Sequence, residues 1–284
     1  MHDQAFRFPS PVDQLPLQVY VWQARGPDRG SVVIAHGAAE HAQRYDRFAC
    51  ELSAHGLEVV ALDHRGHGQS PGPGGLGDFG KAGWSGLVSD VAGLIERVRE
   101  MHPGRGVALF GHSMGSFAAQ RMCHTRSELI DALVLSGSTV FEPPRPGEPP
   151  LALELNAPFE PARTPYDWLS RDHAEVDKYV ADPLCGFEGR LAGPPFSFED
   201  LLEMSNPTGL KGIRDDLPVL LLAGDADPLN RGLTGLHRLR ELWTEAGVRR
   251  IDALYYAEGR HEMLNEVNRD QVTQDVIGWL LDVL

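Results

Sequence analysis

Apolar positions along the chain fall into short continuous runs that alternate with longer segments of helical spacing. Runs such as residues 31–35 and 219–223 are unbroken, which is typical of strands buried on both faces of a parallel sheet. Segments such as residues 84–101 repeat their apolar side chains every three or four positions, as a helix with one buried face does. The predicted strands are residues 6–8, 17–22, 31–35, 58–63, 107–110, 132–135, 219–223 and 251–256, and the predicted helices are residues 44–55, 84–101, 114–124, 233–246 and 265–283.

This alternation predicts an α/β fold, with a mostly parallel eight-stranded sheet and helices on both faces. Residues 138–217 interrupt it after the sixth strand and begin with a proline-rich segment that suits neither a helix nor a central strand. An insertion of about 80 residues is too long for a simple loop. Its larger apolar side chains, which favour packed structure over a linker, include Tyr166, Trp168, Phe187, Phe196 and Leu201. We therefore expect a core of residues 1–137 and 218–284 and a helical cap of residues 138–217, with one helix capped by Asp172 and Glu175 and another over residues 198–204.

A serine lies between the strand at residues 107–110 and the helix that follows it. The sequence there reads Gly111-His112-Ser113-Met114-Gly115, so small residues stand two positions either side of the serine. A sharp strand-to-helix turn holds such a hydroxyl out as a nucleophile and needs those small residues because strand and helix crowd together. The backbone N–H of Met114 would lie at a helix N-terminus, where it can receive an oxyanion.

A serine nucleophile needs a base and a group that orients the base. His261 follows the predicted strand at residues 251–256, and Asp225 and Asp227 follow the strand at residues 219–223. The ends of parallel strands meet at the edge where open α/β sheets place their sites. His261 is thus the expected base, and either aspartate is short enough to be the acid.

Two other loops carry polar residues after a strand. In the loop at residues 36–41, a small residue can direct its backbone N–H at a developing oxyanion. Asp63, His64 and His67 are residue types that bind metals, but no partner cluster with ligand spacing accompanies them in the sequence. We interpret them as a hydrogen-bonded turn and expect neither a metal nor another cofactor.

Composition narrows the possible partners and the compartment. The net charge of −14 disfavours nucleic acid and anionic lipid. The N-terminus lacks the basic and apolar segments of a secretory signal, and no apolar run approaches the roughly 20 residues that span a bilayer. Three cysteines, Cys50, Cys123 and Cys185, without metal-ligand spacing are typical of reduced, structural thiols. A cytoplasmic protein is expected.

Five segments together resemble the α/β-hydrolase superfamily, in particular its monoacylglycerol lipase and lysophospholipase-like branch, which is grouped with the S33 serine aminopeptidases. They are HGAAEHAQRY (36–45), LDHRGHGQS (62–70), GHSMG (111–115), LLLAGDAD (220–227) and EGRHEMLNE (258–266). The resemblance implies a catalytic triad of Ser113, Asp227 and His261, with Asp227 preferred over Asp225. It also implies an oxyanion hole formed by the backbone N–H groups of Ala38 and Met114.

The resemblance implies a serine hydrolase that cleaves esters with a single acyl chain through an acyl-enzyme intermediate. A peptidase, an aminopeptidase or a carbon–carbon bond hydrolase would use the same triad, and a non-catalytic binding module on the same scaffold is a further alternative. The expected partner is a small-molecule ester. Residues 138–217 contain 15 acidic and seven basic residues, so at most weak membrane association is expected, and the sequence does not predict the oligomeric state.

Overall fold

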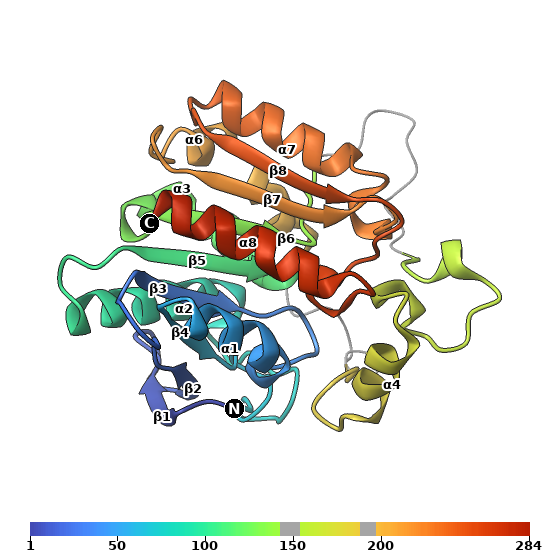
Figure 1. Cartoon of the computed structure of the whole chain (residues 1–284), viewed down its shortest axis with the longest axis horizontal. Coiled ribbons are helices and arrows are strands. Elements are labelled where there is room, and N and C mark those ends of the chain that lie inside the picture. The colour runs from blue at the N-terminus through green and yellow to red at the C-terminus, as the bar shows by residue number, and fades with distance from the viewer. Residues whose placement is uncertain (143–153, 188–196) are drawn as a thin grey trace.

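One sheet of eight strands organises the chain, and helices cover both of its faces (Figure 1). The computed structural model describes residues 1–142, 154–187 and 197–284. In chain order the strands are β1 (Gln4–Pro9), β2 (Pro16–Trp22), β3 (Gly30–Ala35), β4 (Leu57–Leu62), β5 (Val107–His112), β6 (Ala132–Ser136), β7 (Val219–Gly224) and β8 (Ile251–Tyr256). Their order across the sheet is β1-β2-β4-β3-β5-β6-β7-β8. Strand β2 pairs antiparallel with both β1 and β4, and all other pairs are parallel, which confirms the predicted fold class.

The central strands are continuously apolar because each face of the sheet has its own core. In β3, Val33 packs into the core shared with α2 (Gly83–Met101), α3 (Met114–Arg126) and α7 (Thr234–Glu245). Its neighbours Val32 and Ile34 pack into the opposite core with α1 (Asp46–Ala54) and α8 (Arg269–Val283). Successive side chains of a strand point to opposite faces, so a strand covered on both sides needs apolar residues at every position.

The predicted helices differ from the observed ones mainly at their ends. A short 3₁₀ turn, Ala42–Tyr45, precedes α1, and another, Met263–Asn265, precedes α8, which begins four residues later than predicted. Helical spacing continues through such turns, so apolar periodicity does not mark where the α-helix begins. No helix in the three described stretches combines the length and the apolar character that crossing a bilayer requires.

The described parts of the insertion after β6 contain three short α-helices, of which α4 (His173–Ala181) lies beyond the carboxyl ends of the strands (Figure 1). The other two are α5 (Phe198–Leu202) and α6 (Pro207–Leu210). Phe196 and most of the proline-rich segment lie outside the described residues.

The expected reciprocal cap at the start of α4 is only half formed. The Asp172 side chain accepts from Ala174 N, but Ser170 Oγ already satisfies the Asp172 N–H, and Glu175 binds Arg47 and Lys178 instead. The complete capping box occurs at α5, between Ser197 and Asp200.

Candidate active site

Ser113 lies at the junction of β5 and α3, in a backbone conformation that few residues other than glycine adopt. Its φ is +50° and its ψ is −119°, which costs on the order of 1–3 kcal/mol. Hydrogen bonds hold the turn in place: Ser113 N donates to Ser136 O at 2.9 Å, and Ser113 O accepts from Ser116 N at 2.8 Å. The half-buried serine is therefore fixed at the carboxyl end of the sheet.

Close packing around this turn explains the two flanking glycines. A Cβ on Gly115 would lie 2.1 Å from the carbonyl oxygen of Ala35, and one on Gly111 would lie 2.7 Å from Gly115 O. Both distances are far below contact, and the obstructing atoms belong to the backbone. The helix can therefore approach the sheet this closely only with glycine at both positions.

His261 and Asp227 form a buried pair in the loops after β8 and β7. His261 Nδ1 lies 2.8 Å from Asp227 Oδ2, and each residue is about 1% exposed. Asp227 Oδ1 accepts from Leu229 N at 2.9 Å, which fixes the carboxylate. Asp225 is exposed and its Oδ1 accepts from Glu258 N at 2.7 Å, so this side chain shapes the His261 loop from outside.

The surroundings of His261 favour a protonated ring more than burial opposes it. Burial lowers the pKa of His261, but the Asp227 carboxylate and its hydrogen bond, with Glu262 and Glu40 nearby, raise it above its ordinary value. His261 Nε2 is buried and has no hydrogen-bond partner among the described residues. The ring is held between Trp168, at 4.7 Å between ring centroids, and His112, at 4.8 Å. One nitrogen is thus engaged by a carboxylate, and the other is left for a proton transfer.

Two glycines show how closely the serine and histidine loops approach the sheet edge. A Cβ on Gly37 would lie 3.2 Å from Ser113 Cβ. A Cβ on Gly137, directly after β6, would lie 2.9 Å from His261 Cε1. Because Gly137 also follows Ser136, which binds the Ser113 backbone, the structure brings the serine and the histidine to one edge.

The loop after β3 is shaped for close approach to Ser113. Ala38 is exposed, and Ala39 adopts a positive φ of +51°. Gly37 N donates to Glu40 Oε1, so this N–H is turned inward. Met114 is the first residue of α3, where the helix dipole favours negative charge. The two predicted oxyanion-hole residues therefore flank Ser113 on adjacent strand ends.

A buried ion network that the sequence did not reveal joins this loop to the His261 loop. Arg44 Nη1 donates to Glu40 Oε2 at 2.6 Å, and Arg44 binds both oxygens of Glu262, at 2.6 and 2.7 Å. Burial raises the pKa of the Glu40 carboxyl, but the Arg44 charge and hydrogen bonds from Gly37 and Tyr45 lower it overall. The i, i+4 spacing of Glu40 and Arg44 was visible in the sequence, but the pairing with Glu262 was not.

Asp63 holds together the loop at residues 62–70. Its carboxylate accepts from Ala42 N at 2.8 Å and from Gln69 N at 2.7 Å, and His67 Nδ1 lies 3.0 Å from Arg65 O. Burial raises the pKa of Asp63 despite these bonds. These residues thus form a hydrogen-bonded turn beneath the loop that carries Ala38.

Comparison with known proteins gives the family. The sequence profile described as serine aminopeptidase, S33, matches residues 26–268. The chain belongs to this family of α/β hydrolases. It is 31% identical to a monoacylglycerol lipase of Mycolicibacterium smegmatis over 272 residues, which cover 93% of this chain and 92% of that protein. It is 35% identical to the human monoglyceride lipase over 221 residues, 73% of this chain and 68% of that protein.

Solved structures share the fold over almost the whole chain. A thermostable carboxyl esterase from Bacillus coagulans superposes with a TM-score of 0.87 at 24% identity, over 100% of this chain and 99% of the esterase. A monoacylglycerol lipase from Paleococcus ferrophilus gives a TM-score of 0.69 at 26% identity, over 94% of this chain and 99% of that one. The present chain thus resembles monoacylglycerol lipases in sequence and shares its fold with the esterase.

Proposed function

We propose that this S33-family protein hydrolyses carboxylic esters with a single acyl chain, such as monoacylglycerols or lysophospholipids, and that Ser113, His261 and Asp227 are its catalytic triad. The protein is a carboxylic ester hydrolase, as its lipase and esterase relatives are. The observation that carries the triad is the buried His261–Asp227 pair, whose free nitrogen lies at the same sheet edge as the strained Ser113 turn.

In this mechanism Ser113 Oγ attacks the ester carbonyl and His261 Nε2 takes the hydroxyl proton. The tetrahedral intermediate collapses when His261 returns that proton to the departing alcohol, which leaves the acyl group on Ser113. A water molecule then attacks the acyl-enzyme, again with His261 as the base, and releases the acid. Asp227 holds the ring in one tautomer and stabilises the imidazolium formed in both steps.

The developing oxyanion would be bound by the backbone N–H groups of Ala38 and Met114. The exposed position of Ala38 and the position of Met114 at the start of α3 support this assignment. The Arg44 network stabilises both loops, because Glu40 fixes the backbone beside Ala38 and Glu262 directly follows His261. Arg44 is therefore a positioning residue that holds the loop carrying Ala38 in place relative to His261.

Substrate size is inferred from the insertion over residues 138–217, which we propose to be the cap. Trp168 packs on the His261 ring, and Phe187 packs edge-on against His67 at 5.1 Å between ring centroids. Aromatic walls of this kind suit one acyl chain and hinder bulky triacylglycerols. The excess of acidic over basic residues in the insertion opposes accumulation on anionic membranes, which fits an enzyme acting in the cytoplasm.

The test is a substrate panel of p-nitrophenyl esters of increasing chain length, monoacylglycerols, a triglyceride emulsion and aminoacyl amides. We expect hydrolysis of the aryl esters and monoacylglycerols, and no rate jump when substrate exceeds its solubility limit. The Ser113→Ala variant is the matched control. Faster cleavage of aminoacyl amides would favour the aminopeptidase alternative, and strong activation on the emulsion would contradict the role given to the cap.

A further inference from the structure

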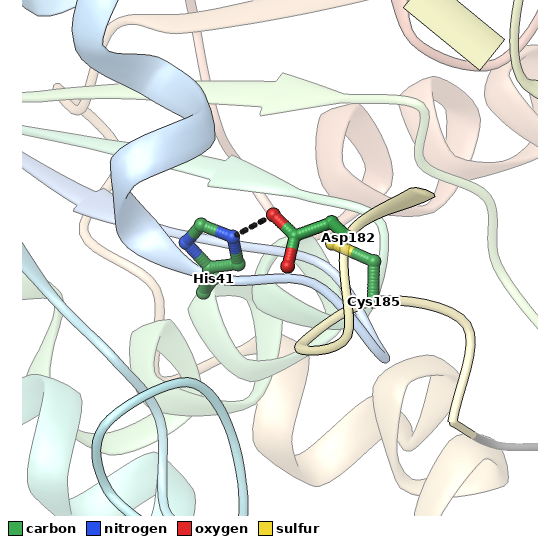
Figure 2. Close-up of side chains that lie close together, drawn as sticks. All are labelled: His41, Asp182 and Cys185. Atoms are coloured by element: carbon green, nitrogen blue, oxygen red, sulfur yellow. Dashed lines mark hydrogen bonds and ion pairs between the residues drawn. The ribbon is translucent and has the colours of Figure 1, made fainter. Parts of the chain in front are cut away.

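A turn in the insertion packs directly on the loop that carries Ala38. Gly186 N donates to Ala39 O at 3.0 Å, and the Tyr179 hydroxyl donates to the same oxygen at 2.9 Å. This contact brings together His41, Asp182 and Cys185 (Figure 2). One ligating atom from each side chain lies within 4.8 Å of those of the other two.

Hydrogen bonds hold the His41 and Asp182 side chains in place before any ligand binds. His41 Nε2 lies 2.9 Å from Asp182 Oδ2. Figure 2 marks this contact with a dashed line. Asp182 Oδ1 accepts from Leu184 N at 2.9 Å, and Cys185 N donates to Asp182 O at 3.0 Å, so the turn orients the carboxylate and fixes the backbone of Cys185. Fixing a ligand through its remaining oxygen is how proteins orient metal-binding carboxylates.

The combination of imidazole, carboxylate and thiol is suited to a borderline-soft divalent cation. Zinc binds histidine nitrogen and carboxylate oxygen at about 2.0–2.2 Å and cysteine sulfur at about 2.3 Å, so tetrahedral ligands lie about 3.3–3.7 Å apart. The ligating atoms lie within 4.8 Å of one another, so they would have to approach by at most about 1.5 Å to reach that spacing. A cavity of about 130 Å³ borders Asp182 and Cys185 and gives room for a water molecule as the fourth ligand.

The exposure of Asp182 and the balance of charges around the cluster allow a cation to enter. His41 and Cys185 are buried, whereas the Asp182 side chain is 31% exposed and leaves a route from solvent. Burial raises the pKa of the Cys185 thiol, so zinc must displace the proton of a neutral thiol. Glu40 and Glu262 neutralise the nearby Arg44, which limits its repulsion of a cation. Zinc binding would release the thiol proton to solvent and move the His41 proton to Nδ1, and the dication would balance the carboxylate and the new thiolate.

We propose that His41, Asp182 and Cys185 bind one Zn²⁺ ion, which links the turn at residues 182–186 to the loop that carries Ala38. The site is separate from the serine chemistry, which needs no metal, so the proposal does not depend on the proposed function. The cluster could not be predicted from ligand spacing because His41 lies 141 residues before Asp182.

The experiment is a metal titration of the full-length Cys50→Ser protein, which removes the partly exposed thiol and leaves Cys123 fully buried. We expect one Zn²⁺ per chain by equilibrium dialysis, and Co²⁺ used as a probe should give a thiolate-to-cobalt charge-transfer band. Zinc at about 100 times its Kd should raise the Tm by about 5 °C, since it binds only the folded protein.

Two further variants in the Cys50→Ser background decide the outcome. Cys185→Ser should abolish the cobalt band and weaken zinc binding at least tenfold. Asp182→Asn can still hydrogen-bond His41 and should also weaken zinc binding at least tenfold, while keeping the band. Zinc binding that is unchanged in both variants, or no zinc binding in the parent protein, would overturn the proposal, and Tm values measured in EDTA verify that each variant is folded.

Discussion

Replacing Asp227 with asparagine tests the proposed mechanism most directly. Asparagine has nearly the same shape and can still accept from Leu229 N, so the fold of the loop should persist. What is lost is the negative charge beside His261 Nδ1, which lies 2.8 Å from the carboxylate oxygen. Because the base becomes positively charged in both chemical steps, this charge acts on the transition states.

The size of the loss follows from the geometry. Two unit charges about 4 Å apart interact by about 4 kcal/mol at an effective dielectric constant of about 20, which suits a buried site. Since about 1.4 kcal/mol corresponds to tenfold in rate, kcat should fall about 10³-fold. Asparagine can also hold the wrong imidazole tautomer, so a loss of up to about 10⁴-fold is expected.

The assay is steady-state hydrolysis of a short p-nitrophenyl ester across a pH series. Asp225→Asn is the matched control, because Asp225 is exposed and its carboxylate accepts from Glu258 N rather than contacting the His261 ring, and it should lose less than about threefold. In Asp227→Asn the acid limb of kcat/KM should also move to lower pH, since burial lowers the pKa of His261 once the carboxylate is gone. A loss below tenfold in Asp227→Asn, or equal losses in the two variants, would refute the reasoning.

Three further predictions follow from the same site. In the wild type, kcat/KM should fall as the pH decreases through a value above 6.5, because the pKa of His261 is raised and its protonated ring cannot act as a base; an acid limb below 6.5 would contradict this. Ser113→Ala and Ser113→Gly should both lose at least about 10³-fold in kcat. Only the glycine variant should also be more stable, by about 1 kcal/mol of unfolding free energy measured in urea, because glycine relieves the strain of the positive φ. Gly115→Ala should lower the Tm by several degrees because its Cβ would meet Ala35 O, whereas Gly278→Ala, in open space on α8, should leave the Tm unchanged or raise it slightly.

Much of the core could be predicted because its signals are local. Continuous apolar runs mark strands that are covered on both faces, and helical spacing marks the layers that cover them, so the eight-stranded sheet followed from the pattern alone. Helix boundaries were less certain, as the 3₁₀ turn before α8 shows, because a 3₁₀ turn and an α-helix place apolar residues at similar intervals. The half-formed cap at Asp172 had a different cause, since distant Arg47 competes for Glu175.

The sequence by itself determined the Ser113 turn. A serine at a strand end with glycine two positions to each side is a local pattern, and its close packing is typical of a sharp strand-to-helix turn. It also limited the acid to Asp225 or Asp227. The resemblance preferred Asp227, but only the tertiary structure shows that Asp227 bonds His261 while Asp225 accepts from Glu258 N in the same loop. The same holds for the Arg44–Glu262 pair, 218 residues apart in the chain. Pairings of this kind depend on how loops from separate strand ends pack together, and such packing produces no repeating pattern of residues in the sequence.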